Sequence, residues 1–219
     1  MSALLLPYAT ALLLGTLHAL EADHVAAVTS FAVRRPGIRS AVRFGVRWSL
    51  GHGGTILVVG TVLILLATQL PAASTRWLER LVGAVMIGLG VWTIRGAAAL
   101  HAHSHTHADG VVHAHLHSHA IVDDHGHAHA ATVVGLLHGF AGSGAAVALI
   151  PVAGFDSALA GIFFLVVFGA GTIAGMAVYG LLAGFVAGRT ADRSVRLARL
   201  LARVTGGFTM IVGFVWLLR

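Results

Sequence analysis

Long apolar segments, separated by short arginine-containing stretches, dominate this chain of 219 residues. A helix needs about 20 consecutive, mostly apolar residues to cross the hydrocarbon layer of a bilayer. The pattern predicts membrane spans near residues 3–32, 44–68, 78–98, 131–151, 158–187 and 200–218. We therefore expect an all-α polytopic membrane protein, residues 1–219 forming a single transmembrane domain of six helices. The first and fifth spans are long enough to be tilted, kinked or broken.

Composition supports a membrane protein and excludes several kinds of site. The chain is 57% hydrophobic and 10% charged, with a mean hydropathy of +0.88, whereas soluble domains carry about 25% charged residues. Cysteine is absent, which excludes disulfides, thiolate zinc sites and iron–sulfur clusters. The net charge of +6 comes from arginine alone, in short segments between spans. We expect the lipid bilayer, and no nucleic acid, as a partner.

The arginines predict the orientation. One side of the predicted spans carries eleven of them, namely Arg34, Arg35, Arg39, Arg43, Arg47, Arg95, Arg189, Arg193, Arg196, Arg199 and Arg203. The other side carries three, namely Arg76, Arg80 and Arg219. Because basic loops stay in the cytoplasm, we expect a multi-pass protein of the bacterial plasma (inner) membrane with both termini outside.

Similar sequences in the two halves predict an internal repeat, with repeat one at 1–98 and repeat two at 131–219. Gly15-Thr16-Leu17-His18 aligns with Gly135-Leu136-Leu137-His138, and Gly54-Thr55-Ile56 resembles Gly171-Thr172-Ile173. Arg80, Gly83 and Gly90 align with Arg203, Gly206 and Gly213. Since each repeat has three spans, an odd number, the second copy is inverted. Such 3+3 repeats are typical of secondary transporters.

Four ionisable side chains, His18, Glu21, Asp23 and His24, fall within seven residues of the first span. An acidic side chain at the centre of a span costs roughly 2.5–3.5 kcal/mol, so these groups need mutual pairing, water or a cation. Imidazole and carboxylate together suit nickel, cobalt or zinc better than calcium or magnesium. One straight helix cannot turn all four onto one ion, so either the span unwinds or other spans supply ligands.

The predicted metal site has two further histidines, which lie in other spans. We expect His18, His24 and His52 to bind the ion. Asp23 and Glu21 supply charge. His138 guards the pathway, and Ser143, in the stretch from His138 to Gly144, lies on it. Glycines four residues apart, Gly171/Gly175 and Gly180/Gly184/Gly188, predict close helix packing.

A histidine-rich loop, residues 99–130, joins the two repeats on the side expected to be cytoplasmic. Its eleven histidines are His101, His103, His105, His107, His113, His115, His117, His119, His125, His127 and His129. The segment has almost no large apolar residues, so we expect it to be disordered without metal. Neighbouring imidazoles are well suited to capture metal at many weak sites.

The first span carries His-x-x-x-x-Asp-His, from His18 to His24, and Phe44 to Gly54 contains Gly-His-Gly. These stretches resemble the motifs of the nickel/cobalt transporter (NiCoT/NicO) superfamily. The second-half motif from Leu137 to Gly144 is similar to its six-span branch of urease- and hydrogenase-accessory membrane proteins. The resemblance implies transport of Ni²⁺ or Co²⁺. The alternative is an accessory protein that delivers nickel to urease or hydrogenase maturation factors without transporting it.

An enzyme is not expected, and no catalytic residue or catalytic cofactor is predicted. Intramembrane metal hydrolases use His-Glu-x-x-His, whose two histidines share a helix face. The six-residue spacing of His18 and His24 differs from it. No ATP-binding motif occurs, so coupling to an ion gradient, or none, is expected.

Overall fold

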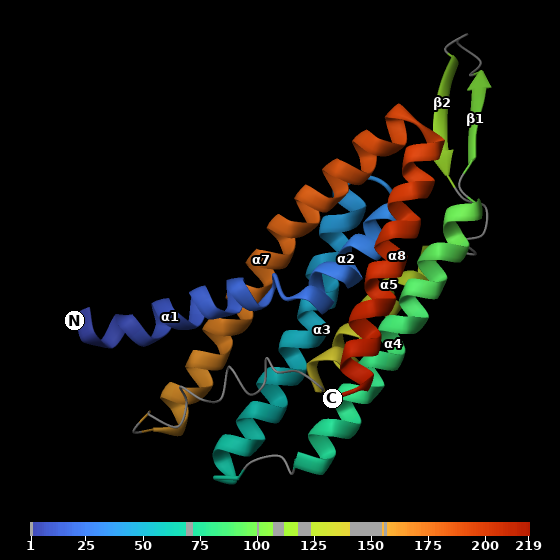
Figure 1. The fold of residues 1–219 in the computed structure, drawn as a ribbon. Helices are drawn as coiled ribbons and strands as arrows, with labels where there is room; N and C mark the ends of the chain where they lie inside the picture. The colour runs from blue at the N-terminus through green and yellow to red at the C-terminus, as the bar shows by residue number, and fades with distance from the viewer. Residues whose placement is uncertain are drawn as a thin grey trace.

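The computed structural model describes residues 2–68, 72–99, 101–106, 112–117, 124–140, 155 and 157–219. Packed, mutually tilted helices form the body, and a β-hairpin projects from one end (Figure 1). The elements in chain order are α1 (Ser2–His18), α2 (Ala22–Arg34), α3 (Ile38–Leu65), α4 (Ala72–Ala99), β1 (His101–Thr106), β2 (Val112–His117), α5 (Asp124–Phe140), α7 (Ala158–Arg193) and α8 (Val195–Leu217).

Four described helices, α3, α4, α7 and α8, are long and apolar enough to cross a membrane. The pair α1 and α2 makes a fifth span if it is counted as one broken helix. These segments coincide with five of the predicted spans, which confirms a helical multi-pass membrane protein. In the remaining predicted span, 131–151, the apolar helix Ala131–Phe140 is described, and residues 141–151 lie outside the described residues.

The first predicted span is broken, whereas the fifth is one continuous helix of 36 residues, α7. Between α1 and α2 the chain bends by 53°. The amides of Leu20 and Glu21 donate to carbonyls three residues back, at Leu17 and His18, and Glu21 is extended. Irregular backbone at membrane depth is tolerated only where protein buries it or where it lines a cavity. The break therefore marks a candidate functional position.

Turn chemistry sets three other helix boundaries. Gly37, between α2 and α3, has φ of +142°, a conformation that residues with a side chain rarely adopt. Ser157 accepts a hydrogen bond from the amide of Ala160 at the start of α7. Ser194 is extended, ends α7 and caps α8 through the amide of Arg196. A single residue thus reverses the chain between two long helices.

Backbone-to-backbone glycine contacts hold the helices together in matching pairs. Gly15 of α1 lies against Phe168 and Thr172 of α7, leaving no room for a Cβ. Gly135 of α5 lies in the same way against Trp48 and His52 of α3. The residues of the first contact correspond to those of the second at a distance of 120 positions: Gly15 to Gly135, Phe168 to Trp48 and Thr172 to His52.

Glycines of α7 and α3 contact α1 and α5 in turn, and the corresponding residues again differ by 120 positions. Gly171 of α7 packs on Leu12 of α1, and Gly51 of α3 packs on Thr132 of α5. The contacts therefore pair Gly171 with Gly51, not with Gly54 as the sequence comparison suggests. No neighbouring heavy atom lies within 4 Å of a Cβ built on Gly54, whereas Gly171 packs closely on α1. The similar sequences Gly54-Thr55-Ile56 and Gly171-Thr172-Ile173 therefore do not occupy equivalent positions in the two halves.

Helices α4 and α8 also pack reciprocally through glycine. Gly83 and Gly213 each lie against the other's carbonyl oxygen, and Gly90 and Gly206 do the same. The predicted close packing of α7 is confirmed at four of its glycines. Gly171 and Gly175 contact α1, whereas Gly180 and Gly184 contact the first turns of α3.

The histidine-rich segment differs from the expected disordered loop. Strands β1 and β2 pair antiparallel, with residue 101 opposite 117 and residue 105 opposite 113, and α5 begins at Asp124. The alternation of histidine with another residue has the period of two that suits a strand. Composition alone therefore led to a wrong expectation about the backbone of this segment.

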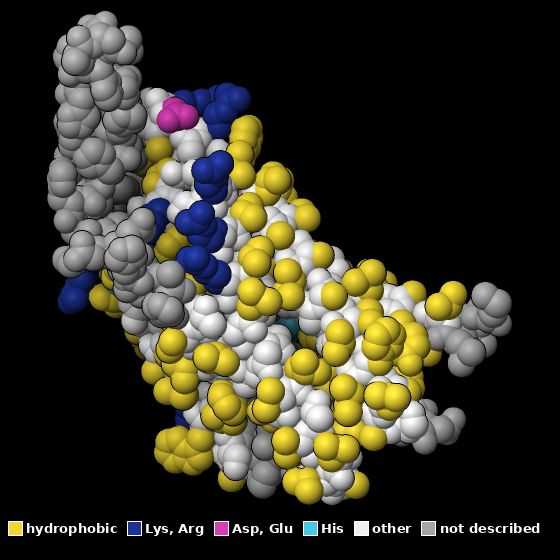
Figure 2. Space-filling view, turned by 180° about the vertical axis from the view of Figure 1, so that it is seen from behind, with side chains coloured by type: hydrophobic (Ala, Val, Ile, Leu, Met, Phe, Trp, Pro, Cys, Tyr) yellow, Lys and Arg dark blue, Asp and Glu magenta, His cyan; other side chains and the backbone are white. Residues whose placement is uncertain are grey.

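Basic side chains gather at one end of the molecule. In Figure 2 they cluster in the upper part of the face shown, and hydrophobic side chains are spread over the rest of it. Gly184 of α7 contacts Ile38 of α3, which brings the arginines after Gly184 level with those at the start of α3. Both arginine-rich segments thus lie at the same end of the helices.

Candidate metal site

Side chains from four helices converge at the break between α1 and α2. His18 ends α1, Asp23 and His24 lie in the first turn of α2, His52 comes from α3, and His138 comes from α5. All five are at most 4% exposed. The chain thus buries four imidazoles and a carboxylate together inside an apolar bundle, where unpaired polar groups would be costly.

Three of the imidazoles point one nitrogen each at a common centre. The Nε2 atoms of His18 and His52 are 3.0 Å apart, and those of His24 and His52 are 3.5 Å apart. One ligand nitrogen from each of the three rings lies within 4.8 Å of the others. Histidine nitrogens bind zinc at about 2.0–2.1 Å, which places neighbouring nitrogens of a tetrahedral shell about 3.3 Å apart. The observed separations match that spacing.

Asp23 orients one of these ligands and ties it to the second half of the chain. Its Oδ1 accepts from the backbone amide and from Nδ1 of His24, at 2.9 and 2.8 Å. Its Oδ2 accepts from Nε2 of His138 at 2.9 Å. Because Nδ1 of His24 donates, its Nε2 carries a lone pair toward the centre. Carboxylates hold metal-binding histidines in this way in many proteins.

Glu21 lies beside His18 in a more open position, at ion-pair distance but without a well-aligned hydrogen bond to its ring. Its Oε1 is 2.9 Å from Nδ1 of His18, which leaves Nε2 of His18 free to face the centre. The Glu21 side chain is 35% exposed, so solvent screens it more than Asp23. The two carboxylates therefore flank the three-histidine centre, one buried and one partly open.

Aromatic rings form the walls of the site. Trp48 stacks on His52 with ring centres 5.0 Å apart, and it meets His24 edge-on at 4.7 Å. Phe168 lies 5.4 Å from His18 on the α7 side. Neither Trp48 nor Phe168 was among the predicted site residues. The signal for Trp48 was its position four residues before His52 in one helix, which puts both on one face.

The structure brings together the six intramembrane metal candidates that the sequence predicts, with His138 joined to Asp23 rather than facing the three-histidine centre. A second group able to hold an ion, Asp23, His24 and His138, overlaps the first. Ser143 lies outside the described residues. The side chains of the histidine-rich segment are not described either, so its capture of metal stays a prediction.

The fold and the site together define a class: a multi-pass helical membrane protein with a buried histidine–carboxylate cluster at a helix break. Residues 9–214 match the family described as the cytochrome c biogenesis protein transmembrane region. The chain belongs to this family. It contains no cysteine, so thiol–disulfide exchange is not available to it.

Among curated proteins, a urease accessory protein, UreH of Bacillus sp. (strain TB-90), is 30% identical over 204 residues, 91% of this chain and 85% of the relative. This match confirms the urease-accessory branch that the motifs suggested. A protein of Methanocaldococcus jannaschii with the provisional name nickel/cobalt efflux system is 30% identical over 99 residues, 44% of this chain and 45% of the relative.

A third relative is the chloroplast protein FOR GROWTH AND FERTILITY 2 of Arabidopsis thaliana, 27% identical over 173 residues. That match covers 78% of this chain and 45% of the plant protein. No solved structure matches. The first relative is named for an accessory role to urease and the second for nickel/cobalt efflux, and neither name refers to an enzymatic reaction of the protein itself.

Proposed function

We propose that this chain transports a divalent transition metal ion, Ni²⁺ or Co²⁺, across the bacterial inner membrane through the cluster at the α1–α2 break. The observation that carries the proposal is the convergence of the Nε2 atoms of His18, His24 and His52 in the interior of the bundle. In a dry apolar interior, three imidazole nitrogens facing one another gain most from a shared cation. Nitrogen-rich shells favour nickel, cobalt and zinc over magnesium and calcium.

In this proposal His18, His24 and His52 bind the ion directly, and the carboxylates offset its charge. Asp23 holds the ring of His24 by hydrogen bonds and neutralises part of the charge at short range, while Glu21 contributes charge from its position beside His18. His138 anchors Asp23 from the second half of the chain, so movement of α5 changes the support of the site. Ser143, three residues after α5, is proposed to line the route of the ion.

We further propose six spans in a 3+3 inverted repeat. The glycine contacts support it, because the surroundings of Gly15 match those of Gly135, and the surroundings of Gly51 match those of Gly171. These matches relate α1 to α5 and α3 to α7 by a constant 120 residues. The reciprocal α4–α8 contacts are those that a two-fold axis would generate. Residues 131–151 then form the remaining span. The site lies where the repeats meet, as in other inverted-repeat transporters.

The uneven charge distribution supports an orientation with the arginine-rich end in the cytoplasm. Both termini are then outside, and the histidine-rich segment 99–130 is cytoplasmic. We propose that this segment captures metal at many low-affinity positions next to the cytoplasmic end of the transport route. Its role is buffering and supply, not selection among metals.

Flux into sealed liposomes tests transport directly. Liposomes containing only the purified full-length chain should take up radioactive nickel faster than protein-free liposomes, and His24→Ala should lower the rate at least tenfold. The matched control is Thr190→Ala, which removes a side chain that donates to Val186 near the arginine-rich end and should leave flux unchanged. Uptake by the wild type at the protein-free rate would contradict transport.

A second candidate function is an accessory protein that passes nickel to urease or hydrogenase maturation factors. The similarity to a urease accessory protein over most of both chains favours it. Under that function the purified chain binds nickel but gives no flux in liposomes, and a maturation factor is needed to remove the metal. In cells, greater nickel tolerance with the gene indicates efflux, and greater sensitivity indicates import.

A further inference from the structure

A basic stripe on α3, between the metal site and the arginine-rich end of the helix, has a chemistry that metal transport does not explain. Arg39, Arg43 and Arg47 are four residues apart, so they lie on one face of α3 at intervals of about 6 Å. Arg39 and Arg43 are exposed and Arg47 is half-buried. A divalent cation gains nothing from these groups, so the stripe points to an anion.

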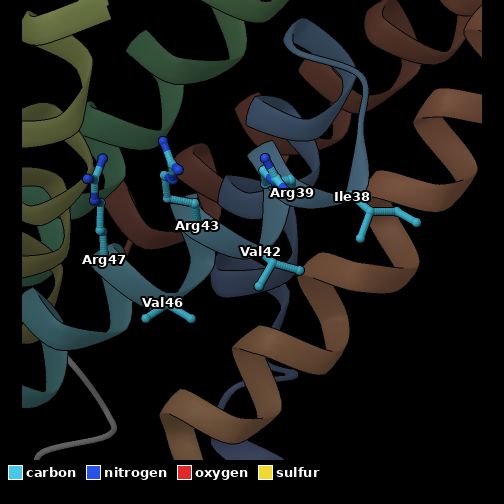
Figure 3. A pocket seen from close by; sticks show the side chains of 6 residues that line it. All are labelled: Ile38, Arg39, Val42, Arg43, Val46 and Arg47. Carbon is cyan, nitrogen blue, oxygen red and sulfur yellow. The ribbon is translucent and has the colours of Figure 1, made fainter.

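The stripe borders a hollow with an apolar wall. Ile38, Val42 and Val46 line this hollow together with the three arginines, so it is a shallow, open depression on the surface of α3, of about 580 Å³. Figure 3 shows the three arginine side chains pointing the same way from α3, while Val42 and Val46 point away from them. In Figure 2, basic side chains likewise run along the edge of a hydrophobic surface. One side of the hollow therefore suits an anionic group and the other suits hydrocarbon.

The depth of the stripe matches the lipid headgroup layer. From Trp48 to Leu65, α3 has 18 residues without a charged side chain other than titratable His52. At about 1.5 Å per residue this part is about 27 Å long, nearly the thickness of the hydrocarbon core. The three arginines then fall at and just beyond the edge of that core, with Arg47 the deepest.

No carboxylate among the described side chains neutralises this stripe. The acidic residues whose side chains are described are Glu21, Asp23, Glu79 and Asp192, and no ion pair described for them involves the three arginines. A guanidinium at the edge of the hydrocarbon is favourable when its charge is matched by a phosphate oxygen, which it binds with two parallel hydrogen bonds. Lipid phosphates lie at this depth on every side of a membrane protein.

We propose that Arg39, Arg43 and Arg47 bind the phosphodiester headgroup of an anionic phospholipid, with an acyl chain running along Ile38, Val42 and Val46. Basic positions on the cytoplasmic side of membrane helices are suited to anionic lipids. The lipid would also brace α3, which supplies His52 to the metal site. The proposal requires only that α3 spans the membrane and is independent of metal transport.

Lipid retention measured by native mass spectrometry tests the proposal. Full-length protein is extracted from vesicles with equal amounts of phosphatidylglycerol and phosphatidylcholine, and the lipid that remains bound is identified. Each arginine near a charged surface contributes roughly fivefold in affinity, so Arg39→Gln, Arg43→Gln and Arg47→Gln together should lower phosphatidylglycerol retention roughly 100-fold. The matched control removes the same charge at the other end, as Arg76→Gln, Arg80→Gln and Arg219→Gln, and should retain lipid within twofold of the wild type.

Two further measurements distinguish a lipid site from a general effect of positive charge and from a site for free phosphate. Replacing the same three arginines by lysine keeps the charge but removes the planar, two-bond geometry, and should give an intermediate loss of retention in a protein that still elutes as a folded species. Inorganic phosphate added to the detergent solution should not displace the lipid, because the apolar wall holds the acyl chain. Equal lipid retention by the wild type and the glutamine variant, or ready displacement by phosphate, would overturn the proposal.

Discussion

Replacing Asp23 by asparagine separates the orientation of the metal ligands from their presence. The carboxylate accepts three hydrogen bonds, two from His24 and one from His138. Asparagine is nearly the same size, but its NH₂ group can only donate a hydrogen bond. In either orientation of the amide, this NH₂ group would face an N–H group of His24 or His138, so two donors would oppose each other. Either the contact to His138 is lost, or His24 turns to its other tautomer and presents a proton, rather than a lone pair, to the centre.

The size of the effect follows from these contacts. Loss of a carboxylate that orients a metal-binding histidine lowers metal affinity about 10- to 100-fold, or about 1.4–2.7 kcal/mol. Because Asp23 supports His24 and is also charged and buried, we expect the upper end of this range. Glu21→Gln is the matched comparison. Its carboxylate is 35% exposed, so solvent already weakens it, and we expect a loss of less than about tenfold.

The assay is equilibrium dialysis with radioactive nickel on detergent-solubilised protein lacking residues 101–129, which removes metal bound by the histidine-rich segment. Helical content and the thermal midpoint are measured on every variant, so that an affinity is compared only between folded proteins. A nickel Kd for Asp23→Asn within threefold of the parent would contradict this prediction, because it would show that the carboxylate neither orients His24 nor neutralises the ion.

The packing and the ligand chemistry lead to four other predictions. Gly135→Ala places a methyl group against the backbone of α3 and should destabilise the protein by about 1–3 kcal/mol in thermal unfolding, whereas Gly54→Ala, which has open space around it, should not lower the midpoint. Gly96→Ala occupies the place of the buried Arg34 guanidinium, which lies 4.2 Å from the centre of the Trp92 ring, and loss of that contact should cost about 0.5–2 kcal/mol; an unchanged midpoint would show that the arginine moves aside freely. Acidification should release nickel only well below about pH 5.5, because an apolar bundle disfavours a charged imidazolium and only a protonated imidazole lacks the lone pair that binds the metal; binding that stays constant down to about pH 3 in a protein that is still folded would argue against imidazole ligands. Deleting residues 101–129 should change the flux or the bound-metal ratio while leaving selectivity intact, and complete loss of flux would give this segment an essential role.

The residues of the candidate intramembrane site could be singled out from the sequence because charged and imidazole groups are rare in apolar spans. His18, Asp23, His24 and His52 were recognisable from their positions alone, and helix geometry showed that one straight helix could not bring them together. The sequence between Ala19 and Glu21 contains neither glycine nor proline, so the location of the break was not predictable from residue type. The partner of His138 was also hidden, because only the packing of α5 on α3 brings it to Asp23.

The repeat and the histidine-rich segment were predicted less well, for two different physical reasons. Small residues are frequent in all these helices, so Gly54 was aligned where the contacts favour Gly51. In the segment around β1, composition favoured disorder, whereas the alternation His-x-His-x-His from His101 to His105 indicated a strand. The equivalence of Gly51 and Gly171 depends on contacts between segments that are distant in the sequence. The strand β1, by contrast, is indicated by the local alternation of residues.

Nickel K-edge X-ray absorption on the protein without residues 101–129 reads the ligands of the proposed intramembrane ion directly. We predict about one nickel per chain with imidazole nitrogens in its shell at about 2.0–2.1 Å, and loss of that signal in His24→Ala. A folded protein that takes up no nickel, or a shell made of oxygen alone, would contradict a three-histidine metal site.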